Sequence, residues 1–443
     1  MIRGSAVRQS LKVLSARRLM STAQTKFTTL SNGVTVATAT NPSATTSTVG
    51  LYIGGGSRSE HPYNNGISAL TANILANGSE NGVLLSSENT KEVNAIVAQT
   101  TNSNVEKAAQ LIGSIASNAD KVLSKGDFAA AKAALIAQTN AIESNPESKV
   151  LEHLNASAFQ GYSLGLPTLG TSESVANLEL DDAIRHLERQ LVTSNTVIAA
   201  VGNFNHDKLV DTLEGNLSIT ANLKPATQPA SFLGSEVRMR DDTLPKAYVS
   251  IAVNGEGLNS PDHYLSKVAA AVYGSFEQNT TTTPYTSPKL ASIVQEYGIV
   301  DKYHHFSQSY SDAGLWGFYA EISHIMAVDE FVHFALKEWN RLSISVTDAE
   351  VARAKAQVKT ALAAKLNTPA AVASELGQKI LLTGHATSIH DAFAKIDAIT
   401  TKDIKAWGQA KLWDRDIVIS GTGQIEGLFD YNRNRNDMAM MRW

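Results

Sequence analysis

Residues 64–78 read NNGISALTANILANG, a glycine-marked turn that leads into a helix. Three positions of this helix, Ala69, Ala72 and Asn73, follow the spacing i, i+3 and i+4, which places them on neighbouring parts of one face. None of these three side chains carries a titratable group.

A strand, a glycine turn and a helix occur in this order twice in the chain. STVGLYI at residues 47–53 predicts a strand, and three glycines at residues 54–56 follow it. Two hundred residues further on, AYVSIAV at residues 247–253 is followed by NGEG and by the helical pattern LSKVAAAVYGS at residues 265–275. The repeat indicates that the chain is a duplication.

A second pair of segments supports the duplication. VIAAVGNF at residues 197–204 and VISGTGQI at residues 418–425 each predict a buried strand that ends at a glycine and follows an amphipathic helix. Two pairs at similar offsets make chance a poor explanation.

A proline-containing segment separates the two halves. LKPATQPAS at residues 223–231 has two prolines and no acidic residue, which is typical of a linker. We therefore expect an N-terminal domain at residues 21–222, a linker at residues 223–231 and a C-terminal domain at residues 232–443. At 443 residues the chain is long enough for two hydrophobic cores.

Strand and helix patterns are mixed within each half. KFTTL and VTVATA flank Asn32-Gly33, a strong hairpin signal. Long helical patterns cover residues 106–123, 126–144 and 347–366, and the last has Thr347 at the N-cap position with Glu350 three residues later. This mixture predicts an α+β fold, with a mainly antiparallel sheet packed against helices in each domain.

The turn NNG and the helix after it resemble the zinc-site region of the pitrilysin-type (inverzincin) peptidases, and most of all the mitochondrial processing peptidases. That family carries His-x-x-Glu-His two residues after NNG, and its members have two such α+β domains. The two histidines bind Zn²⁺ and the glutamate takes a proton from the metal-bound water. Ala69, Ala72 and Asn73 stand at these three positions here.

The resemblance also implies a third metal ligand, a glutamate on a later helix. Matching back from VLEHLNASAFQ through IESNPESK places Gln138 at that position, and a neutral amide is a poor substitute for a carboxylate beside Zn²⁺. All four positions, Ala69, Ala72, Asn73 and Gln138, therefore depart from the family pattern. We predict an inactive peptidase scaffold without catalytic residues, metal or cofactor.

Composition excludes several other classes of protein. The chain has no cysteine, which rules out disulfides, thiolate metal sites and cysteine nucleophiles. No apolar run approaches the ~20 residues of a membrane-spanning helix, so membrane association is expected to be peripheral and through partners. The net charge of −4 and the absence of a basic stripe argue against a nucleic-acid partner.

Nucleotide and esterase motifs find no support either. GTGQIEG at residues 421–427 has its glycines spaced G-x-G-x-x-x-G, and only 16 residues follow, too few for a βαβ unit. The chain has neither a P-loop nor a GxSxG motif.

The histidines do not have the spacing of metal ligands. His304 and His305 are adjacent in a strand-like segment and point to opposite faces, whereas His385 and His390 are five residues apart. We interpret His153, which lies in a helix near Glu147 and Glu152, as an interface or partly buried histidine.

Two pairs of adjacent acidic residues have an equally structural interpretation. Asp181-Asp182 and Asp241-Asp242 are expected in solvated turns or helix caps, where neighbouring carboxylates are common. Neither is interpreted as an acid–base pair.

The first 20 residues have the composition of a mitochondrial presequence. They carry five basic residues and an apolar stripe at helical spacing, whereas the first acidic residue of the chain is Glu60. Arg18-Leu19-Met20 before Ser21 resembles a matrix cleavage site, so we expect removal of residues 1–20. The alternative is a disordered basic tail.

Several inactive members share this scaffold, and one distinguishing feature is a glycine-rich loop in the substrate-binding subunit of the processing peptidase. Thr280 to Thr283 replace those glycines here, and β-branched residues restrict the backbone that such a loop needs free. A presequence-gripping role therefore loses support.

The C-terminal half resembles instead the fungal core subunits of mitochondrial ubiquinol–cytochrome c oxidoreductase (complex III). The matching segments are FLGSEVRMRDDTLPKAYVSIAV, DAGLWGF, EWNRLSISVTDAEV, FAKIDAIT and GTGQIEGLFDY. The resemblance implies a non-catalytic subunit on the matrix side of the inner membrane, in a dimeric complex. Its implied partners are core protein 2, cytochrome b, the c-type cytochrome, the Rieske protein and small subunits. A non-catalytic subunit of a processing peptidase is the alternative.

The C-terminus ends in an apolar tip. Its large apolar residues are Met438, Met440, Met441 and Trp443. Such a tip anchors in a partner's pocket or folds back onto its own domain, and the sequence leaves both interpretations open.

Overall fold

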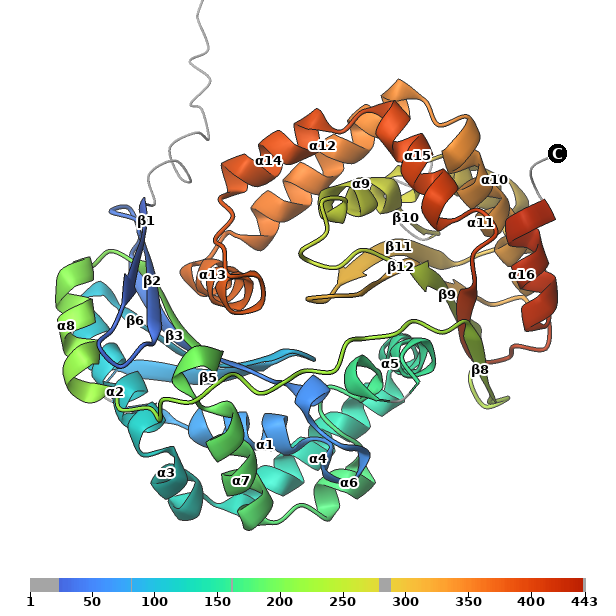
Figure 1. The fold of residues 1–443 in the computed structure, drawn as a ribbon. Coiled ribbons are helices and arrows are strands. Elements are labelled where there is room, and N and C mark those ends of the chain that lie inside the picture. The colour runs from blue at the N-terminus through green and yellow to red at the C-terminus, as the bar shows by residue number, and fades with distance from the viewer. Residues whose placement is uncertain (1–23, 81, 161, 279–287, 441–443) are drawn as a thin grey trace, which may run out of the picture.

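The fold consists of two α+β halves, each built on one sheet (Figure 1). The computed structural model describes residues 24–80, 82–160, 162–278 and 288–440. The predicted presequence at residues 1–20, the threonine run at 280–283, and Met441 and Trp443 lie outside the described residues.

The first sheet has seven strands in the order β1-β2-β7-β3-β6-β5-β4. All neighbours are antiparallel except β2 and β7, which are parallel with Thr35 opposite Val197. The strands are β1 (Gln24–Thr29), β2 (Thr35–Thr40), β3 (Thr46–Gly54), β4 (Ser79–Glu80), β5 (Val83–Asn89), β6 (Val93–Thr101) and β7 (Thr196–Gly202).

The second sheet repeats this topology with six strands in the order β10-β11-β12-β9-β13-β8. Its one parallel pair is β8 and β13, with Ser235 opposite Val418, in the place that β2 and β7 hold in the first sheet. The strands are β8 (Ser235–Arg240), β9 (Ala247–Asn254), β10 (Ser275–Glu277), β11 (Lys302–Ser309), β12 (Gly314–Ile322) and β13 (Ile417–Gly423).

The predicted duplication is confirmed strand by strand. The first pair of repeated segments forms β3 and β9, and the second forms β7 and β13. In each sheet the two strands are adjacent and antiparallel. The predicted α+β class with two mainly antiparallel sheets is therefore correct.

The hairpin predicted at Asn32-Gly33 is also present. β1 and β2 pair along their whole length, from Gln24 opposite Thr40 to Thr29 opposite Thr35. Gly33 has a φ of 91°, which favours glycine, and the side-chain oxygen of Asn32 accepts a hydrogen bond from the Val34 amide at 3.0 Å.

Helices cover both faces of the sheets. Those of the first half are α1 (Ile67–Leu75), α2 (Val105–Ser117), α3 (Ala119–Lys125), α4 (Phe128–Ser144), α5 (Pro146–Ala158), α6 (Ser172–Ala176), α7 (Leu180–Gln190) and α8 (His206–Asn216). Those of the second half are α9 (His263–Tyr273), α10 (Lys289–Tyr297), α11 (Ala327–Ile344), α12 (Asp348–Lys365), α13 (Pro369–Thr383), α14 (Ile389–Ala398), α15 (Thr401–Lys411) and α16 (Tyr431–Met440).

The single helix predicted over residues 106–123 is wrong. Asn118 leaves the helical conformation at φ −124° and ψ 31°, which separates α2 from α3. Its side-chain amide donates to the Ser114 carbonyl at 3.2 Å, a local bond that competes with the helical pattern. The break redirects the chain so that both Ala119 and Leu123 reach the core of the first half.

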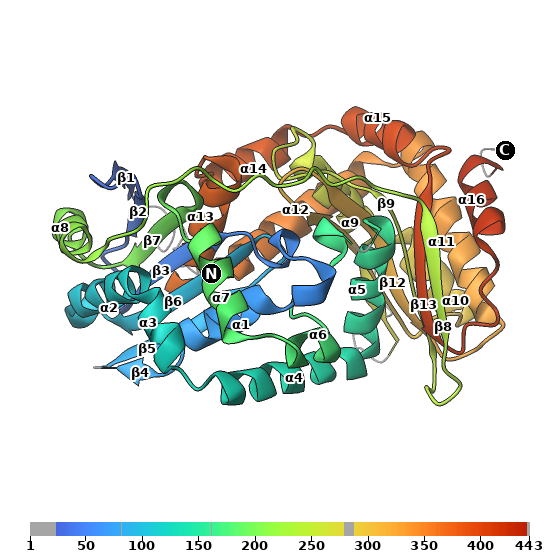
Figure 2. The same ribbon diagram turned by 60° about the horizontal axis from the view of Figure 1, so that its bottom comes forward.

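The two halves exchange helices. α5 belongs to the first half by sequence but packs on β13 and β9 of the second sheet, and α13 of the second half packs on β3 and β7 of the first (Figures 1 and 2). Leu154 of α5 lies in a buried cluster with Val418, and Ile380 of α13 lies in one with Tyr52. Each half therefore completes the core of the other.

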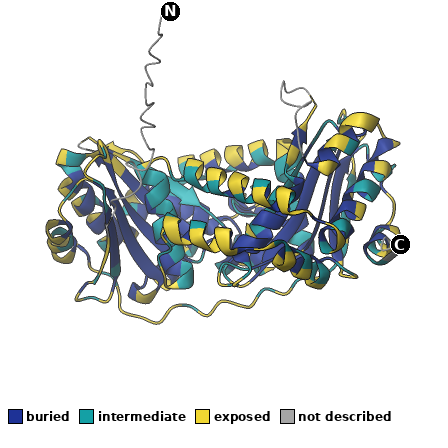
Figure 3. Cartoon of the chain, turned by 90° about the horizontal axis from the view of Figure 1, so that it is seen from above, coloured by how far each residue is buried: buried dark blue, intermediate teal, exposed yellow. Residues whose placement is uncertain are grey.

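The distribution of buried residues reflects the packing of helices on the two sheets. The strands of both sheets are predominantly buried, and the helices carry their exposed residues on the outside (Figure 3). None of the helices in the described residues combines the length and apolar composition needed to cross a membrane.

For Met438, the structure decides between the two interpretations of the apolar C-terminal tip, an anchor in a partner or a tail folded onto its own domain. It is fully buried and belongs to the core of the second half. This residue therefore folds onto its own domain and is unavailable as an anchor.

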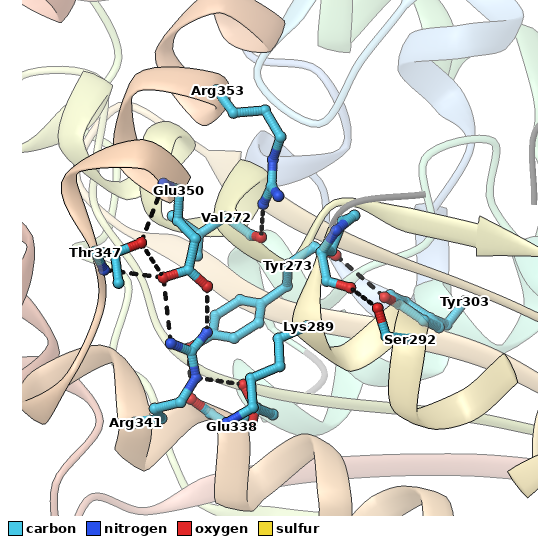
Figure 4. A network of polar contacts seen from close by, with 11 residues as sticks. Val272, Tyr273, Lys289, Ser292, Tyr303, Glu338, Arg341, Thr347, Glu350 and Arg353 are labelled. Carbon is cyan, nitrogen blue, oxygen red and sulfur yellow. Dashed lines mark hydrogen bonds and ion pairs between the residues drawn. The ribbon is translucent and has the colours of Figure 1, made fainter. Parts of the chain in front are cut away.

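A polar network joins α11 and α12 in the second half (Figure 4). Arg341 of α11 donates to Glu338 at 2.6 Å and to Glu350 of α12 at 2.7 Å. Glu350 also forms the predicted capping box with Thr347, whose backbone amide donates to the carboxylate at 2.9 Å. One carboxylate therefore both caps α12 and ties it to α11.

This network gives the stability of the protein a defined pH dependence. Desolvation alone raises the pKa of Glu350, but hydrogen bonds from Arg341 and Thr347 outweigh it and lower the pKa to about 2. Because the folded pKa lies below the usual value of 4.5, the stabilisation is present above about pH 4.5 and is lost as the pH falls toward 2.

We predict that Glu350→Gln lowers the urea midpoint of the full-length chain at pH 6 and that the difference from the unmodified chain narrows steadily toward pH 2. Unfolding curves over this pH range measure the effect. A difference that stays constant with pH would show that the charge of Glu350 contributes nothing.

Gly377 sets the distance between α13 and the first sheet. The ring of Tyr52 lies so close that a Cβ at this glycine would be 2.3 Å from its Cδ2 atom. We predict that Gly377→Ala destabilises the full-length chain by about 1–3 kcal/mol through overpacking, measured by urea unfolding.

Gly215 of α8 provides the matched control, because a Cβ there meets nothing within 4 Å. Gly215→Ala is expected to stabilise the chain by roughly 0.5–1 kcal/mol. Equal effects of the two substitutions would contradict the packing argument.

Candidate functional site

The helix α1 begins at a turn that only glycine fits. Gly66 is its N-cap residue at φ 98°, and a Cβ there would lie 2.7 Å from Val175 Cγ2 and 2.8 Å from the Leu169 carbonyl oxygen. The NNG signature therefore has a structural cause that is independent of any metal.

The buried carboxylate of Glu60 fixes the N-terminus of α1 through hydrogen bonds. It accepts hydrogen bonds from the backbone amides of Gly66 and Ser68, both at 2.8 Å, and from the Asn65 side chain at 2.6 Å. Burial raises the pKa of Glu60, and these donors oppose the rise. A buried acceptor at a helix N-terminus also satisfies free amides and complements the helix dipole.

Two of the three predicted positions on α1 are buried, and the third, Asn73, is partly exposed. Ala69 is fully buried in the core of the first half, and Ala72 is 3% exposed. Asn73 accepts hydrogen bonds from Ser87 at 2.6 Å and from Asn89 at 3.2 Å, both on β5. A neutral amide thus ties α1 to the neighbouring strand through its oxygen.

Among the described residues, no hydrogen bond joins Gln138 to the three predicted positions on α1. It lies on α4 with its side chain exposed, whereas Ser87 and Asn89 are the hydrogen-bond partners of Asn73. Its assignment as the third-ligand position stays a prediction.

The histidines occupy separate structural places. His304 and His305 point to opposite faces of β11 as predicted: His304 lies 3.8 Å from Glu147 of α5, and His305 accepts from the Trp339 indole at 2.9 Å. Burial lowers the pKa of both, and also that of His153 on α5. Within the described ranges, no three His, Cys, Asp or Glu side chains form a group that could hold a metal ion.

The acidic pairs lie in caps and turns, as expected. Asp181 and Asp182 occupy the first turn of α7, where Asp182 accepts from the Glu179 amide at 3.3 Å. Asp241 accepts from Thr243 in a turn, and Asp242 accepts from Arg240 at 2.8 Å.

Comparison with known proteins identifies the family. Residues 35–172 match the model of "Insulinase (Peptidase family M16)", and residues 177–358 match that of "Peptidase M16 inactive domain". A "Cytochrome b-c1 complex reductase subunit, mitochondrial" from Candida albicans is 64% identical over all of both chains. The chain belongs to peptidase family M16.

Further M16 relatives are similar over nearly the whole length. "Cytochrome b-c1 complex subunit 1, mitochondrial" from Saccharomyces cerevisiae is 43% identical and covers 96% of this chain and 95% of its own. "Mitochondrial-processing peptidase subunit beta" from Lentinula edodes is 34% identical and covers 94% of each chain.

A solved structure of an M16 relative has the same fold. A chain of "Complex III2 from Candida albicans, Inz-5 bound" superposes with a TM-score of 0.92 at 64% identity, covering 94% of this chain and all of that one.

Arg58 forms an ionic junction between the two M16 halves, and no sequence motif predicts this junction. Its side chain is 3% exposed and donates to Glu92 of the first half at 2.6 Å and to Asp312 of the second at 2.7 and 2.8 Å. It also donates to the Gln228 carbonyl of the predicted linker at 2.8 Å. We call Arg58, Glu92, Asp312 and Gln228 the Arg58 junction.

The charges in this junction stabilise one another. Desolvation opposes the charged forms, but the hydrogen bonds raise the pKa of Arg58 and lower that of Asp312. The Ala230 amide adds a hydrogen bond to Asp312 at 3.0 Å. The segment predicted as a linker is therefore fixed at both Gln228 and Ala230 and forms part of the contact between the halves.

We predict that Arg58→Met destabilises the full-length chain by about 3–5 kcal/mol, because Glu92 is left buried without a partner charge. Urea unfolding measures the loss. Arg185→Met is the matched control, since Arg185 and Asp181 are exposed and 3.8 Å apart, and we expect a change of at most about 0.5 kcal/mol. A small effect of Arg58→Met would mean that the Arg58 junction contributes little to holding the halves together.

The closed packing around Ala69 leads to a second prediction. Ala69→His inserts an imidazole into the core and should destabilise the chain by roughly 1–3 kcal/mol, with no recovery on addition of Zn²⁺. Ala134→His on the exposed face of α4 should cost at most about 0.7 kcal/mol. Stabilisation of the Ala69→His variant by Zn²⁺ would show that a metal-binding geometry persists.

Proposed function

We propose that this protein is core protein 1 of mitochondrial complex III, a non-catalytic subunit needed for the assembly and stability of the complex that transfers electrons from ubiquinol to cytochrome c. The observation that carries the proposal is the 64% identity over all of both chains with the Candida albicans complex subunit. The TM-score of 0.92 with a chain of the assembled Candida albicans complex supports it.

The proposed lack of peptidase activity rests on α1. Ala69 and Ala72 are buried methyl groups, and Asn73 uses its oxygen to bind Ser87 and Asn89 of β5. These groups supply neither the imidazoles that bind a catalytic zinc nor the carboxylate that activates its water. The protein binds no haem or quinone of its own in this proposal.

The proposed partners are those that the resemblance to the complex III core subunits implies. The chain pairs with core protein 2, which has the same fold, and supports cytochrome b, the c-type cytochrome, the Rieske protein and small subunits in a dimeric complex. It lies on the matrix side of the inner membrane and is held there by these partners. Residues 1–20 serve as the import presequence, and residues 223–231 divide the mature chain into domains at 21–222 and 232–443.

A non-catalytic subunit of a mitochondrial processing peptidase is the second candidate. The 34% identity with the Lentinula edodes processing peptidase subunit over 94% of both chains favours it to a lesser degree.

Purification through a C-terminal tag from mitochondria in mild detergent separates the two candidates. We expect b- and c-type haem spectra and quinol–cytochrome c reductase activity in the purified material. A haem-free soluble complex that cleaves presequence peptides would assign the protein to the processing peptidase instead.

Substitution of the exposed Gln138 tests the absence of catalysis in the same preparation. Gln138→Ala should change neither the haem content nor the reductase activity, because the side chain is exposed on α4. Altered presequence cleavage in this variant would contradict the non-catalytic assignment.

A further inference from the structure

A small cavity lies inside the first half, on the side of α1 that faces α7 and the sheet. Its volume is about 20 Å³, and its wall includes Ala72 and Ser68 of α1, Asn94 of β6, and His186 and Gln190 of α7. Each of these residues is at most 9% exposed. One water molecule needs about 10–15 Å³ in this measure, so the cavity has room for one.

Two polar atoms of the wall have no partner in the protein. They are His186 Nδ1 and Asn94 Oδ1, and both are buried. A buried polar atom without a hydrogen bond costs roughly 1–3 kcal/mol, and most such atoms in folded proteins are satisfied by protein or by ordered water. Two such atoms around one cavity point to a common ligand.

The hydrogen bonds around the other ring nitrogen of His186 determine which ligand fits. Ser68 Oγ lies 2.5 Å from the Glu60 carboxylate and 3.3 Å from His186 Nε2. The hydroxyl proton is directed to the carboxylate, where the bond is charge-assisted and shorter. Ser68 therefore accepts from His186, which places the ring proton on Nε2 and leaves Nδ1 as an acceptor.

The ring is also neutral. Burial, together with the charge of the nearby Arg189, lowers the pKa of His186 to about 4. A neutral ring with its proton on Nε2 needs a donor at Nδ1, and the oxygen of Asn94 needs a donor as well.

We propose that this cavity is a binding site for a single structural water, which donates one proton to His186 Nδ1 and the other to Asn94 Oδ1. Water is the ligand of this size that carries two donors. It completes a chain of hydrogen bonds that runs from Glu60 through Ser68 and His186 to β6. The chain links the N-terminus of α1 and helix α7 to a central strand of the sheet.

A density map of the purified complex at about 2 Å resolution tests the site directly. We expect a peak within about 2.6–3.2 Å of both His186 Nδ1 and Asn94 Oδ1. An empty cavity in a map that shows other buried waters would overturn the proposal. A direct hydrogen bond between the two side chains would also overturn it.

A double-mutant cycle on the full-length chain tests the same site without a map. His186→Phe and Asn94→Leu each remove one partner of the water and leave the other partner incompletely satisfied. We therefore expect the double variant to lose clearly less in urea midpoint than the sum of the single variants. Additive losses would overturn the water bridge.

His206 supplies the matched control for this cycle. It is a buried histidine whose two ring nitrogens already have side-chain partners, Thr28 at 2.8 Å and Thr38 at 2.7 Å. His206→Phe combined with Asn94→Leu should give additive losses, because the two residues share no partner. Equal coupling in both cycles would show that the effect is general to core histidines and would remove the support for a water at His186.

Discussion

Arg58 brings one buried positive charge to the place where the first half, the second half and the segment between them meet. Its guanidinium binds Glu92, Asp312 and the Gln228 carbonyl, so that a single group neutralises a carboxylate from each half. Such an arrangement adds little net stability compared with apolar packing, but it tolerates no other geometry, because any displacement leaves a charge buried without a partner. The relative placement of the halves is therefore specified by chemistry as well as by shape.

The helix α1 is held in place by contacts that require no metal. The left-handed Gly66 and the buried Glu60 position it through backbone conformation and hydrogen bonds. Ala69 and Ala72 are covered by core side chains, and Asn73 bonds to β5. The face of α1 that carries these three residues thus contributes packing and a hydrogen bond.

Local signals in the sequence were sufficient for much of this structure. Asn32-Gly33 marked the first hairpin, Thr347 and Glu350 marked the start of α12, and the repeated strands revealed the duplication, because each depends on residues close together in the chain. The helix exchange and the Arg58 junction were missed because they join residues far apart in the chain, such as Arg58 and Asp312 at a separation of 254 positions, for which one sequence has no periodic pattern. The break at Asn118 was missed because the apolar spacing of the predicted helix continues through this residue.

The exchange of α5 and α13 has a consequence for how the chain acquires its structure. The first sheet presents Tyr52, Val97 and their neighbours to solvent until α13, encoded more than 160 residues after the last strand of that sheet, is available to cover them. A chain that is synthesised or translocated from its N-terminus therefore passes through a long interval with an exposed apolar face, the condition under which proteins aggregate. Folding of the two halves is expected to be a single late event, and the chain is expected to depend on chaperones until its C-terminal third has emerged.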